Sequence, residues 1–310
     1  MKSLKQKGTD KIIVDHLTKD YGHGRGIFDV SFTVKEGEVF GFLGPNGAGK
    51  STTMRHLMGF SKPQKGKSII NGYDCWKQHG KVMKEVGYLP GEVALPEGLN
   101  GKGFLQMMEG LRNSKNQKAV SELLDRFQLN LTGDVKKLSI GEKRKLAVVA
   151  AFMDDPDVLL LDEPTSGLDP VMQEVFIEYV EEQKKQGKTV LLSSHIFSEV
   201  EALCDRIAII KEGKIITVVN AEEVKHFKRK TFEVVFTSEE DYQAFQKESF
   251  EIREKFPKER KLALVVENSQ TNQFVRTITN YEIQSLVEHQ QTLEEYFMHF
   301  YKSDRTFGGI

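Results

Sequence analysis

The chain has 310 residues, of which 39% are hydrophobic and 29% are charged, and its formal net charge is −1. This composition predicts a globular protein with one large domain or two smaller ones, and the near-zero charge argues against a broad nucleic-acid-binding surface. No apolar run approaches the roughly 18–20 residues that cross a bilayer, and the basic start lacks the apolar core of a secretory signal. We therefore expect a cytoplasmic protein, in which Cys75 and Cys204 are packing residues rather than parts of a disulfide framework or zinc cluster.

Short β-rich runs alternate with turn residues near the start of the chain, at 11–17, 28–34, 38–44 and 68–72. The third run, EVFGFLG, leads directly into GPNGAGKSTTMRHLMGF, where Gly and Asn give way to a helical pattern with Met54, Leu57 and Met58 on one face. This order predicts a strand, a glycine-rich loop and a helix.

The loop GPNGAGKS at 44–51 matches the phosphate-binding pattern G-x-x-x-x-G-K-[ST]. Its glycines allow backbone N–H groups to close around phosphate oxygens, and the dipole of the following helix adds to the attraction. Lys50 is expected to reach the β- and γ-phosphates, and the Ser51 hydroxyl is expected to bind Mg²⁺. The predicted nucleotide contacts in this segment are Gly44, Asn46, Gly47, Ala48, Gly49, Lys50, Ser51 and Thr52.

From about residue 81 to residue 149, amphipathic patterns such as GFLQMMEGLRNS and KAVSELLDRFQL predict a helical insertion. Near its end, LSIGEKRKL at 138–146 places a Ser before a Gly-containing turn and a basic, helix-favouring run. This is a second candidate anion-binding helix start, although it lacks the lysine and hydroxyl pair of a phosphate loop. On its residues alone, an ordinary helix cap explains it equally well.

Strands return at 157–163 and 189–194, and the helix predicted between them has Gly187 at its end, which indicates a parallel β/α unit. Asp162 closes the first of these strands and is expected to hold Mg²⁺ through water. The adjacent Glu163 is the candidate general base that polarises the attacking water. His195 follows the second strand, and we expect it to contact the γ-phosphate.

A different unit is expected after about residue 216. The charged stretch 221–230 predicts a linker helix, and its basic run KHFKRK fits a solvated linker better than a contact with anionic lipid. Strands are predicted at 231–236, 262–267 and 283–288, and helices at 241–249, 271–279 and 292–301. The apolar face of the last helix is most simply a packing surface. The predicted domains are 1–220, with a helical subdomain at about 92–150, and 221–310.

The sequence resembles the ATP-binding subunits of ABC transporters. GPNGAGKST, LSIGEKRKL, LLLDEP, SGLD and SSH occur in that family's order across roughly residues 10–215. The resemblance implies an α/β fold, the P-loop NTPase ABC cassette, with a RecA-like core, an antiparallel β subdomain and a helical subdomain, followed here by a small C-terminal α/β domain. It also implies that the chain binds and hydrolyses ATP with Mg²⁺.

The resemblance also explains the second anion-binding motif. In the family, the signature loop LSGGQ binds the ATP held by the other subunit of a head-to-tail dimer. Ser139 and Gly141 would then cap the partner's γ-phosphate. Ile140 and Glu142 depart from the family pattern, and Glu142 places a negative charge near that phosphate.

Further site residues follow from the resemblance. Tyr21 matches the aromatic residue that stacks on adenine, and Asp169 matches the loop that crosses between subunits. Where the family usually has Gln after YLP, this chain has Gly91 and then Glu92, so either Glu92 ligates Mg²⁺ or the backbone alone senses nucleotide, and we favour Glu92. Candidates for contact with the membrane subunit, with core packing as the stronger alternative, are Leu95, Pro96, Phe104 and Met107.

The predicted function is an ATP-hydrolysing subunit that powers a separate transmembrane permease from the inner face of the membrane, as a dimer with a second copy or a homologous cassette. The single cassette with a C-terminal domain resembles the exporter branch, which includes multidrug and antibiotic-resistance exporters. The alternative is a soluble ABC ATPase acting on ribosomes or DNA, but the two cassettes or the long coiled coil of such members are missing here. A regulatory module with vestigial activity is disfavoured by intact Lys50, Asp162, Glu163 and His195.

Overall fold

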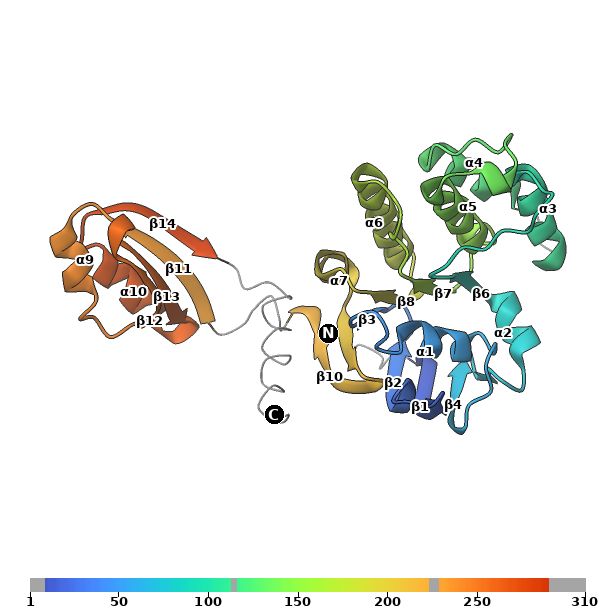
Figure 1. The fold of residues 1–310 in the computed structure, drawn as a ribbon, viewed down its shortest axis with the longest axis horizontal. Helices are drawn as coiled ribbons and strands as arrows, with labels where there is room; N and C mark the ends of the chain where they lie inside the picture. Colours follow the sequence, from blue (N-terminus) through green and yellow to red (C-terminus); the bar gives the residue numbers. More distant parts are fainter. Residues whose placement is uncertain (1–8, 113–115, 223–228, 290–310) are drawn as a thin grey trace, which may run out of the picture. The chain divides into compact units, whose positions relative to one another are not determined.

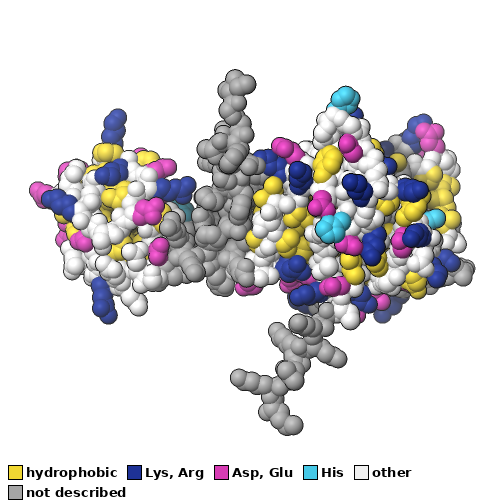
Figure 2. Space-filling view, turned by 90° about the horizontal axis from the view of Figure 1, so that it is seen from below, with side chains coloured by type: hydrophobic (Ala, Val, Ile, Leu, Met, Phe, Trp, Pro, Cys, Tyr) yellow, Lys and Arg dark blue, Asp and Glu magenta, His cyan; other side chains and the backbone are white. Residues whose placement is uncertain are grey.

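The computed structural model describes residues 9–112, 116–222 and 229–289. The chain divides into two compact units, Met1–Asn220 and Ala221–Ile310 (Figure 1). In the described ranges, no helix is both long and apolar enough to cross a membrane. On the face shown in Figure 2, Lys and Arg side chains are interspersed with Asp and Glu over both units.

The first unit contains a four-stranded antiparallel sheet, to which three of the four early β-rich runs belong, whereas the run at 38–44 forms β3 of a second sheet. The strand order of the four-stranded sheet is β2-β1-β4-β5. Buried apolar side chains recur along β2, as expected for a sheet with one face packed on the core. The strands are β1 (Asp10–Asp20), β2 (Gly26–Lys35), β4 (Lys65–Ile70) and β5 (Tyr73–Asp74).

In a six-stranded sheet, the predicted residues Asp162, Glu163 and His195 lie at the carboxyl ends of the strands. Its order is β10-β9-β3-β8-β7-β6, and all neighbours are parallel except the edge strand β10. Every residue of β3, β7 and β8 is buried, which explains their continuous apolar runs. The strands are β3 (Val39–Leu43), β6 (Val86–Leu89), β7 (Val158–Asp162), β8 (Thr189–Ser194), β9 (Arg206–Lys211) and β10 (Lys214–Asn220). Because parallel strands end at the same edge, the segments after β3, β7 and β8 meet there.

The helices of the first unit connect these strands. The helix α6 is followed by Gly187 with φ of 85°, in the left-handed conformation predicted for its end. In Figure 1, α3, α4 and α5 gather beside the β6 end of the sheet. The helices are α1 (Lys50–Leu57), α2 (His79–Glu85), α3 (Gly101–Arg112), α4 (Gln117–Arg126), α5 (Ile140–Phe152), α6 (Pro170–Lys185) and α7 (Phe197–Leu203).

One expectation for this region is wrong. A helical stretch was expected to run from about residue 81, but β6 interrupts it and forms the edge of the six-stranded sheet. The run VGYL is too short for its periodicity to decide between helix and strand. Its conformation is fixed by pairing with β7, in which Val86 lies opposite Val158, and a pairing at that separation leaves no mark on the local sequence.

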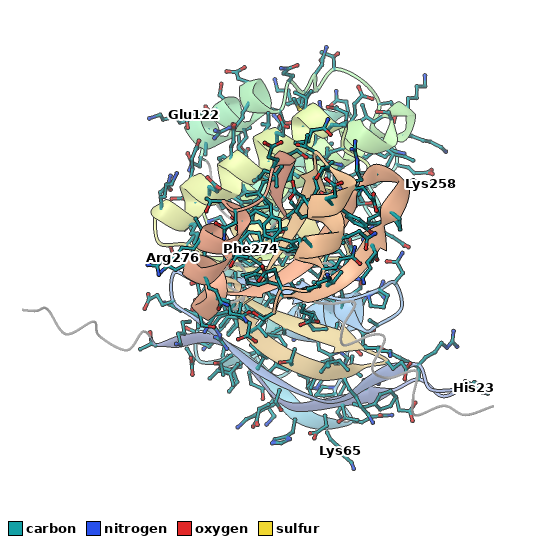
Figure 3. All side chains as sticks on the ribbon, turned by 90° about the vertical axis from the view of Figure 1, so that its left-hand side faces the viewer. His23, Lys65, Glu122, Lys258, Phe274 and Arg276 are labelled. Carbon is teal, nitrogen blue, oxygen red and sulfur yellow. The ribbon has the colours of Figure 1, made fainter. Side chains whose placement is uncertain are left out.

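In residues 229–289, the second unit forms a four-stranded antiparallel sheet in the order β12-β13-β11-β14, together with two α-helices. Phe274 of α10 lies inside this unit, whereas Arg276 on the same helix points away (Figure 3). The elements are β11 (Arg229–Phe236), α9 (Glu239–Phe245), β12 (Glu251–Phe256), β13 (Lys261–Glu267), α10 (Thr271–Ile278) and β14 (Ile283–His289).

The strands and helices predicted between 231 and 288 are present, but two details were missed. The edge strand β12 has the polar sequence EIREKF, which carries no strand pattern of its own. Residues 229 and 230, expected in a linker helix, belong to β11. Positions 223–228 of that linker and the helix predicted at 292–301 lie outside the described residues.

Candidate nucleotide-hydrolysis site

The phosphate loop connects β3 to α1, whose first residue is Lys50. Gly49 precedes it with φ of 109°, a conformation that favours glycine, and a Cβ at this position would lie 2.7 Å from the Ile27 side chain. Lys50 is only 5% exposed. Its ammonium group donates hydrogen bonds to the carbonyl oxygens of Gly44 at 2.6 Å and Pro45 at 3.2 Å. The lysine is therefore held against the loop that it is expected to serve.

Glu163 lies between two of the other predicted site residues. Its Oε1 is 3.0 Å from Lys50 Nζ, and its Oε2 is 2.5 Å from His195 Nδ1. The residue has φ of 48°, in the left-handed region, which costs an L-residue about 1–2 kcal/mol. Lys50 at the start of α1 thus forms one cluster with Glu163 and His195, which directly follow β7 and β8. The structure places His195 on the carboxylate, and its contact with the γ-phosphate stays a prediction.

Asp162, the last residue of β7, is 2% exposed. The Ser193 hydroxyl donates a hydrogen bond to Asp162 Oδ1. The Glu163 N–H donates to the Ser193 carbonyl oxygen at 3.0 Å. Ser193 therefore fixes both acidic residues, a role that the sequence did not reveal, because only His195 of the SSH motif was predicted to act on the nucleotide.

Glu199 of α7 is a buried carboxyl group that the sequence also did not single out. It is 2% exposed, and its Oε2 accepts a hydrogen bond from the Ser194 hydroxyl at 2.6 Å. The same hydroxyl accepts from the Ile196 N–H at 2.9 Å. Burial raises the pKa of Glu199 to about 7. This side chain therefore braces the backbone on both sides of His195.

Tyr21 borders a cavity of about 380 Å³ beside the phosphate loop. The ring is half exposed and lies at the turn between β1 and β2. A flat aromatic surface next to bound phosphates is where an adenine ring would stack. The cavity adds two residues that the sequence did not point to, Arg25 and Gly26, and its lining is Tyr21, Arg25, Gly26, Gly47, Gly49 and Thr52.

Ser139 caps the N-terminus of α5. Its hydroxyl accepts a hydrogen bond from the Glu142 N–H at 3.2 Å, and the Glu142 carboxylate accepts one from the Ser139 N–H at 2.8 Å. Hydrogen bonding to the Ser139 backbone lowers the pKa of Glu142. The helix-cap interpretation is therefore correct, and the unusual Glu142 has a structural role in a capping box. The contact of Ser139 and Gly141 with a partner's nucleotide stays a prediction.

Gly91 lies against Asp162. A Cβ at Gly91 would be 3.0 Å from Asp162 Oδ2, closer than nearly all real Cβ contacts. The following residue, Glu92, is exposed. The backbone of Gly91 therefore occupies the place beside the acidic residues, while metal binding by Glu92 stays a prediction.

Asp169 caps α6 and accepts a hydrogen bond from the Met172 N–H at 3.0 Å. Its loop lies beside the start of α5, since a Cβ at Gly167 would be 2.8 Å from the Ile140 side chain. The sequence-predicted signature and crossing loops are thus neighbours on one surface.

Comparisons with known proteins identify the family. A family model described as ABC transporter matches residues 27–166. The uncharacterized ABC transporter ATP-binding protein YhcH of Bacillus subtilis is 37% identical over 211 residues, which cover 67% of this chain and 69% of the relative. The doxorubicin resistance ATP-binding protein DrrA of Mycobacterium tuberculosis is 37% identical over 228 residues, which cover 71% of this chain and 69% of the relative. A solved structure of the ATP binding subunit of an ABC transporter matches with a TM-score of 0.65 and 30% identity, over 70% of this chain and 92% of that chain.

The chain belongs to the ABC transporter ATP-binding protein family. The resemblance noted in the sequence is confirmed, as is the P-loop NTPase cassette fold. The chain is an ATP-binding protein and an ATPase of the ABC type. The two cysteines are free and buried, as packing residues are.

Proposed function

We propose that this ABC ATPase powers an exporter, working as a dimer of two cassettes attached to the cytoplasmic face of a membrane permease. The observation that carries its catalytic part is the Glu163 carboxylate held between Lys50 and His195 at the edge of the parallel sheet. A carboxylate fixed beside a phosphate loop is the arrangement that hydrolysis of a γ-phosphate requires.

In the proposed reaction, Glu163 accepts a proton from water while the oxygen of that water attacks the γ-phosphorus of ATP. Oε1 of Glu163 lies 3.0 Å from Lys50 Nζ and has no other hydrogen-bond partner among the described residues, so it is the oxygen proposed to take up the proton. His195 orients the other carboxylate oxygen, and Lys50 contributes positive charge beside the phosphates. The chain then releases ADP and phosphate.

The oxygen donors present fit a magnesium ion. Ser51 follows Lys50 in the first turn of α1. The Ser193 hydroxyl holds the Asp162 carboxylate in place. Ser51 and Asp162 would hold the ion. When bound, Mg²⁺ neutralises charge on the phosphates of the substrate.

Dimerisation is supported by the surface around the signature. Ile140 is 77% exposed and Val171 is 64% exposed, next to the exposed Ser139 and Asp169. The cavity beside Tyr21 has no lining residue from 138–146. A motif that caps phosphate but does not border its own chain's nucleotide cavity is suited to the nucleotide of a second cassette.

The proposed permease and the export direction rest on a relative's name and on an exposed apolar surface. The relative DrrA is named a doxorubicin resistance protein, which supports an exporter. On the helical side, Met107 and Leu111 are exposed apolar side chains of α3 that a permease could cover. Phe104 is 8% exposed, so core packing explains it better than a permease contact.

Replacing Glu163 with Gln tests the catalytic assignment. The amide keeps the shape of the side chain but cannot accept the proton, so hydrolysis should fall roughly 100- to 10,000-fold while MgATP binding remains. Phosphate release and equilibrium ATP binding are the two measurements, with exposed Glu174→Gln on α6 as the matched control. The Glu163→Gln protein should also shift from monomer to dimer on a sizing column when MgATP is added. Near-normal turnover in the variant would remove Glu163 as the base.

Gentle detergent purification of the tagged chain from its native cells tests the partner. A polytopic membrane protein in stoichiometric amount, identified by mass spectrometry, is the expected result. Ribosomal proteins or DNA in its place would contradict the exporter proposal and favour a soluble ABC ATPase.

A further inference from the structure

Arg144 of α5 is a buried arginine within the run LSIGEKRKL, in which only Ser139 and Gly141 were predicted to contact nucleotide. It lies five residues after Ser139 and is 5% exposed. Its three donor groups reach three backbone carbonyl oxygens: Nε donates to Ser166 at 3.0 Å, Nη1 to Pro90 at 2.7 Å and Nη2 to Gly91 at 2.5 Å. One side chain thus joins three separate parts of the cassette.

Each of these parts serves a different nucleotide contact. Pro90 and Gly91 follow β6, and Gly91 lies against Asp162. Ser166 belongs to the loop between β7 and α6, three residues after Glu163. Arg144 itself lies in the helix that begins at the signature.

The geometry is specific to arginine. A guanidinium group is planar and carries donors in a fixed fork, so it can hold two loops at a set separation. Burying its charge is costly without full hydrogen bonding, and here each of its three nitrogens has a carbonyl partner. Burial lowers the pKa of Arg144, and the nearby carboxylates of Asp162 and Glu163 oppose part of this shift. The guanidinium charge therefore lies near the acidic pair.

Position 91 makes such a support necessary. Gly91 stands where the family usually has Gln, so this loop has no side chain of its own to anchor it beside Asp162. Its carbonyl oxygen is held by Arg144 instead. The anchor has moved from the loop to the helix.

We infer that Arg144 is a positioning residue that ties the signature helix α5 to the two loops flanking Asp162 and Glu163. The inference rests on the proposed dimer: when a partner's nucleotide is captured at Ser139, movement of α5 is transmitted through Arg144 to the hydrolysis site. Arg144 does not touch the reacting atoms. It sets the distance between loops that do.

The test compares Arg144 with Arg112, an arginine of the helical region whose side chain is 13% exposed. Arg112 ends α3, donates to the Val86 carbonyl oxygen and pairs with Asp154 at 3.2 Å, and none of these groups belongs to the site. Loss of either arginine removes buried hydrogen bonds, so both should lower thermal stability. Only loss of Arg144 should change catalysis.

Arg144→Gln should lower kcat roughly 10- to 100-fold while KM and ATP binding to the monomer change little, because a misplaced catalytic loop slows the chemical step. In the Glu163→Gln background it should also weaken MgATP-dependent dimerisation. Arg144→Lys keeps the charge and the aliphatic stem but has a single ammonium group, so it should also lose at least about tenfold in kcat. Arg112→Gln and Arg112→Lys should keep wild-type kcat.

Two outcomes would overturn the inference. Wild-type kcat in Arg144→Lys would show that charge alone matters and that the bridge between loops does not. A fall in kcat that Arg112→Gln reproduces would show a general stability effect. Either result leaves the proposed function intact, since that stands or falls with Glu163→Gln and the co-purified partner. If the Gln variant does not fold, the Lys variant decides.

Discussion

The parallel sheet of the first unit and the antiparallel sheet of the second unit use their strands differently. In β3, β7 and β8 every side chain is buried, so polar chemistry is possible only where these strands end. In the second unit, Phe232, Val234 and Phe236 of β11 are buried, whereas the alternating Glu233 is half exposed and pairs with Lys261 at 3.8 Å and His289 at 3.5 Å. The first sheet therefore concentrates charged groups at an edge, and the second spreads them over a face.

This contrast explains why function could be assigned to one unit and not to the other. At the edge of the parallel sheet, Glu163 takes a strained backbone conformation and contacts two catalytic candidates. A strained backbone conformation persists only where the surrounding structure imposes it, and such conformations are frequent at functional sites. The ion pairs on the second sheet are exposed, and exposed pairs contribute little free energy.

Replacing Phe274 with Ala tests whether the second unit is a separate folding unit. The ring is 1% exposed and lies 4.6 Å from the Phe232 ring and 5.4 Å from the Phe250 ring, measured between centroids. Its loss should lower the free energy of unfolding of this unit by about 3–5 kcal/mol. The ATPase rate of the cassette should not change.

Thermal unfolding and phosphate release on the same samples make this measurement. Arg276→Ala is the matched control, because Arg276 lies on the same helix but points away from the unit (Figure 3). It should stay within about 0.5 kcal/mol of the wild type. A joint loss of stability and ATPase activity in Phe274→Ala would show that the two units do not function separately.

The motifs and the long buried strands could be predicted because their information is local. A glycine loop between an apolar strand and a helix has one physical use, and the apolar runs of β7 and β8 need no partner to be recognised. β6 and β12 were missed or misjudged because their conformation depends on pairing with distant strands.

The supporting residues of the site were harder to predict for the same reason. The sequence predicted no role for Ser193, Glu199 or Arg144, and each acts through a partner that is remote in the sequence or through burial. Glu199 differs from the many other acidic residues only in being buried, and burial is set by the tertiary structure. The sequence therefore predicted candidate reacting groups but not the residues that orient them.

Glu199 provides a pH-dependent test of the parallel-sheet edge. Its pKa is raised by burial from 4.5 to about 7, with Glu163 contributing in the same direction. Below pH 4.5 the carboxyl is protonated in folded and unfolded protein alike, so it carries no penalty. Between pH 4.5 and about 7 the unfolded protein releases this proton while the folded protein keeps it, so stability falls as the pH rises through this range and levels off above about 7.

Glu199→Gln should remove this loss because the amide stays neutral. Between about pH 4.5 and about pH 8, the wild type should lose on the order of 3 kcal/mol relative to the variant. Denaturant unfolding across this range gives the difference, with the more exposed Glu201→Gln on α7 as control. Parallel pH profiles for wild type and Glu199→Gln would contradict the assignment of a raised pKa.

The smallest expected effect concerns Gly91, where the edge of the sheet is most tightly packed. Alanine adds one Cβ, which would lie 3.0 Å from Asp162 Oδ2 and 3.3 Å from Asp162 Cγ. Accommodating it requires a small shift of the carboxylate or of the loop, at about 1–3 kcal/mol. Gly91→Ala should therefore lower kcat several-fold to about tenfold with ATP binding retained.

Gly110→Ala on α3 separates this crowding from a general effect of losing a glycine. A Cβ at Gly110 would meet nothing within 4 Å, and its helical position should gain about 0.5–1 kcal/mol of stability from alanine. Its kcat should match the wild type. If Gly91→Ala also kept wild-type kcat, the place beside Asp162 would have room for a side chain, and crowding there would not affect catalysis.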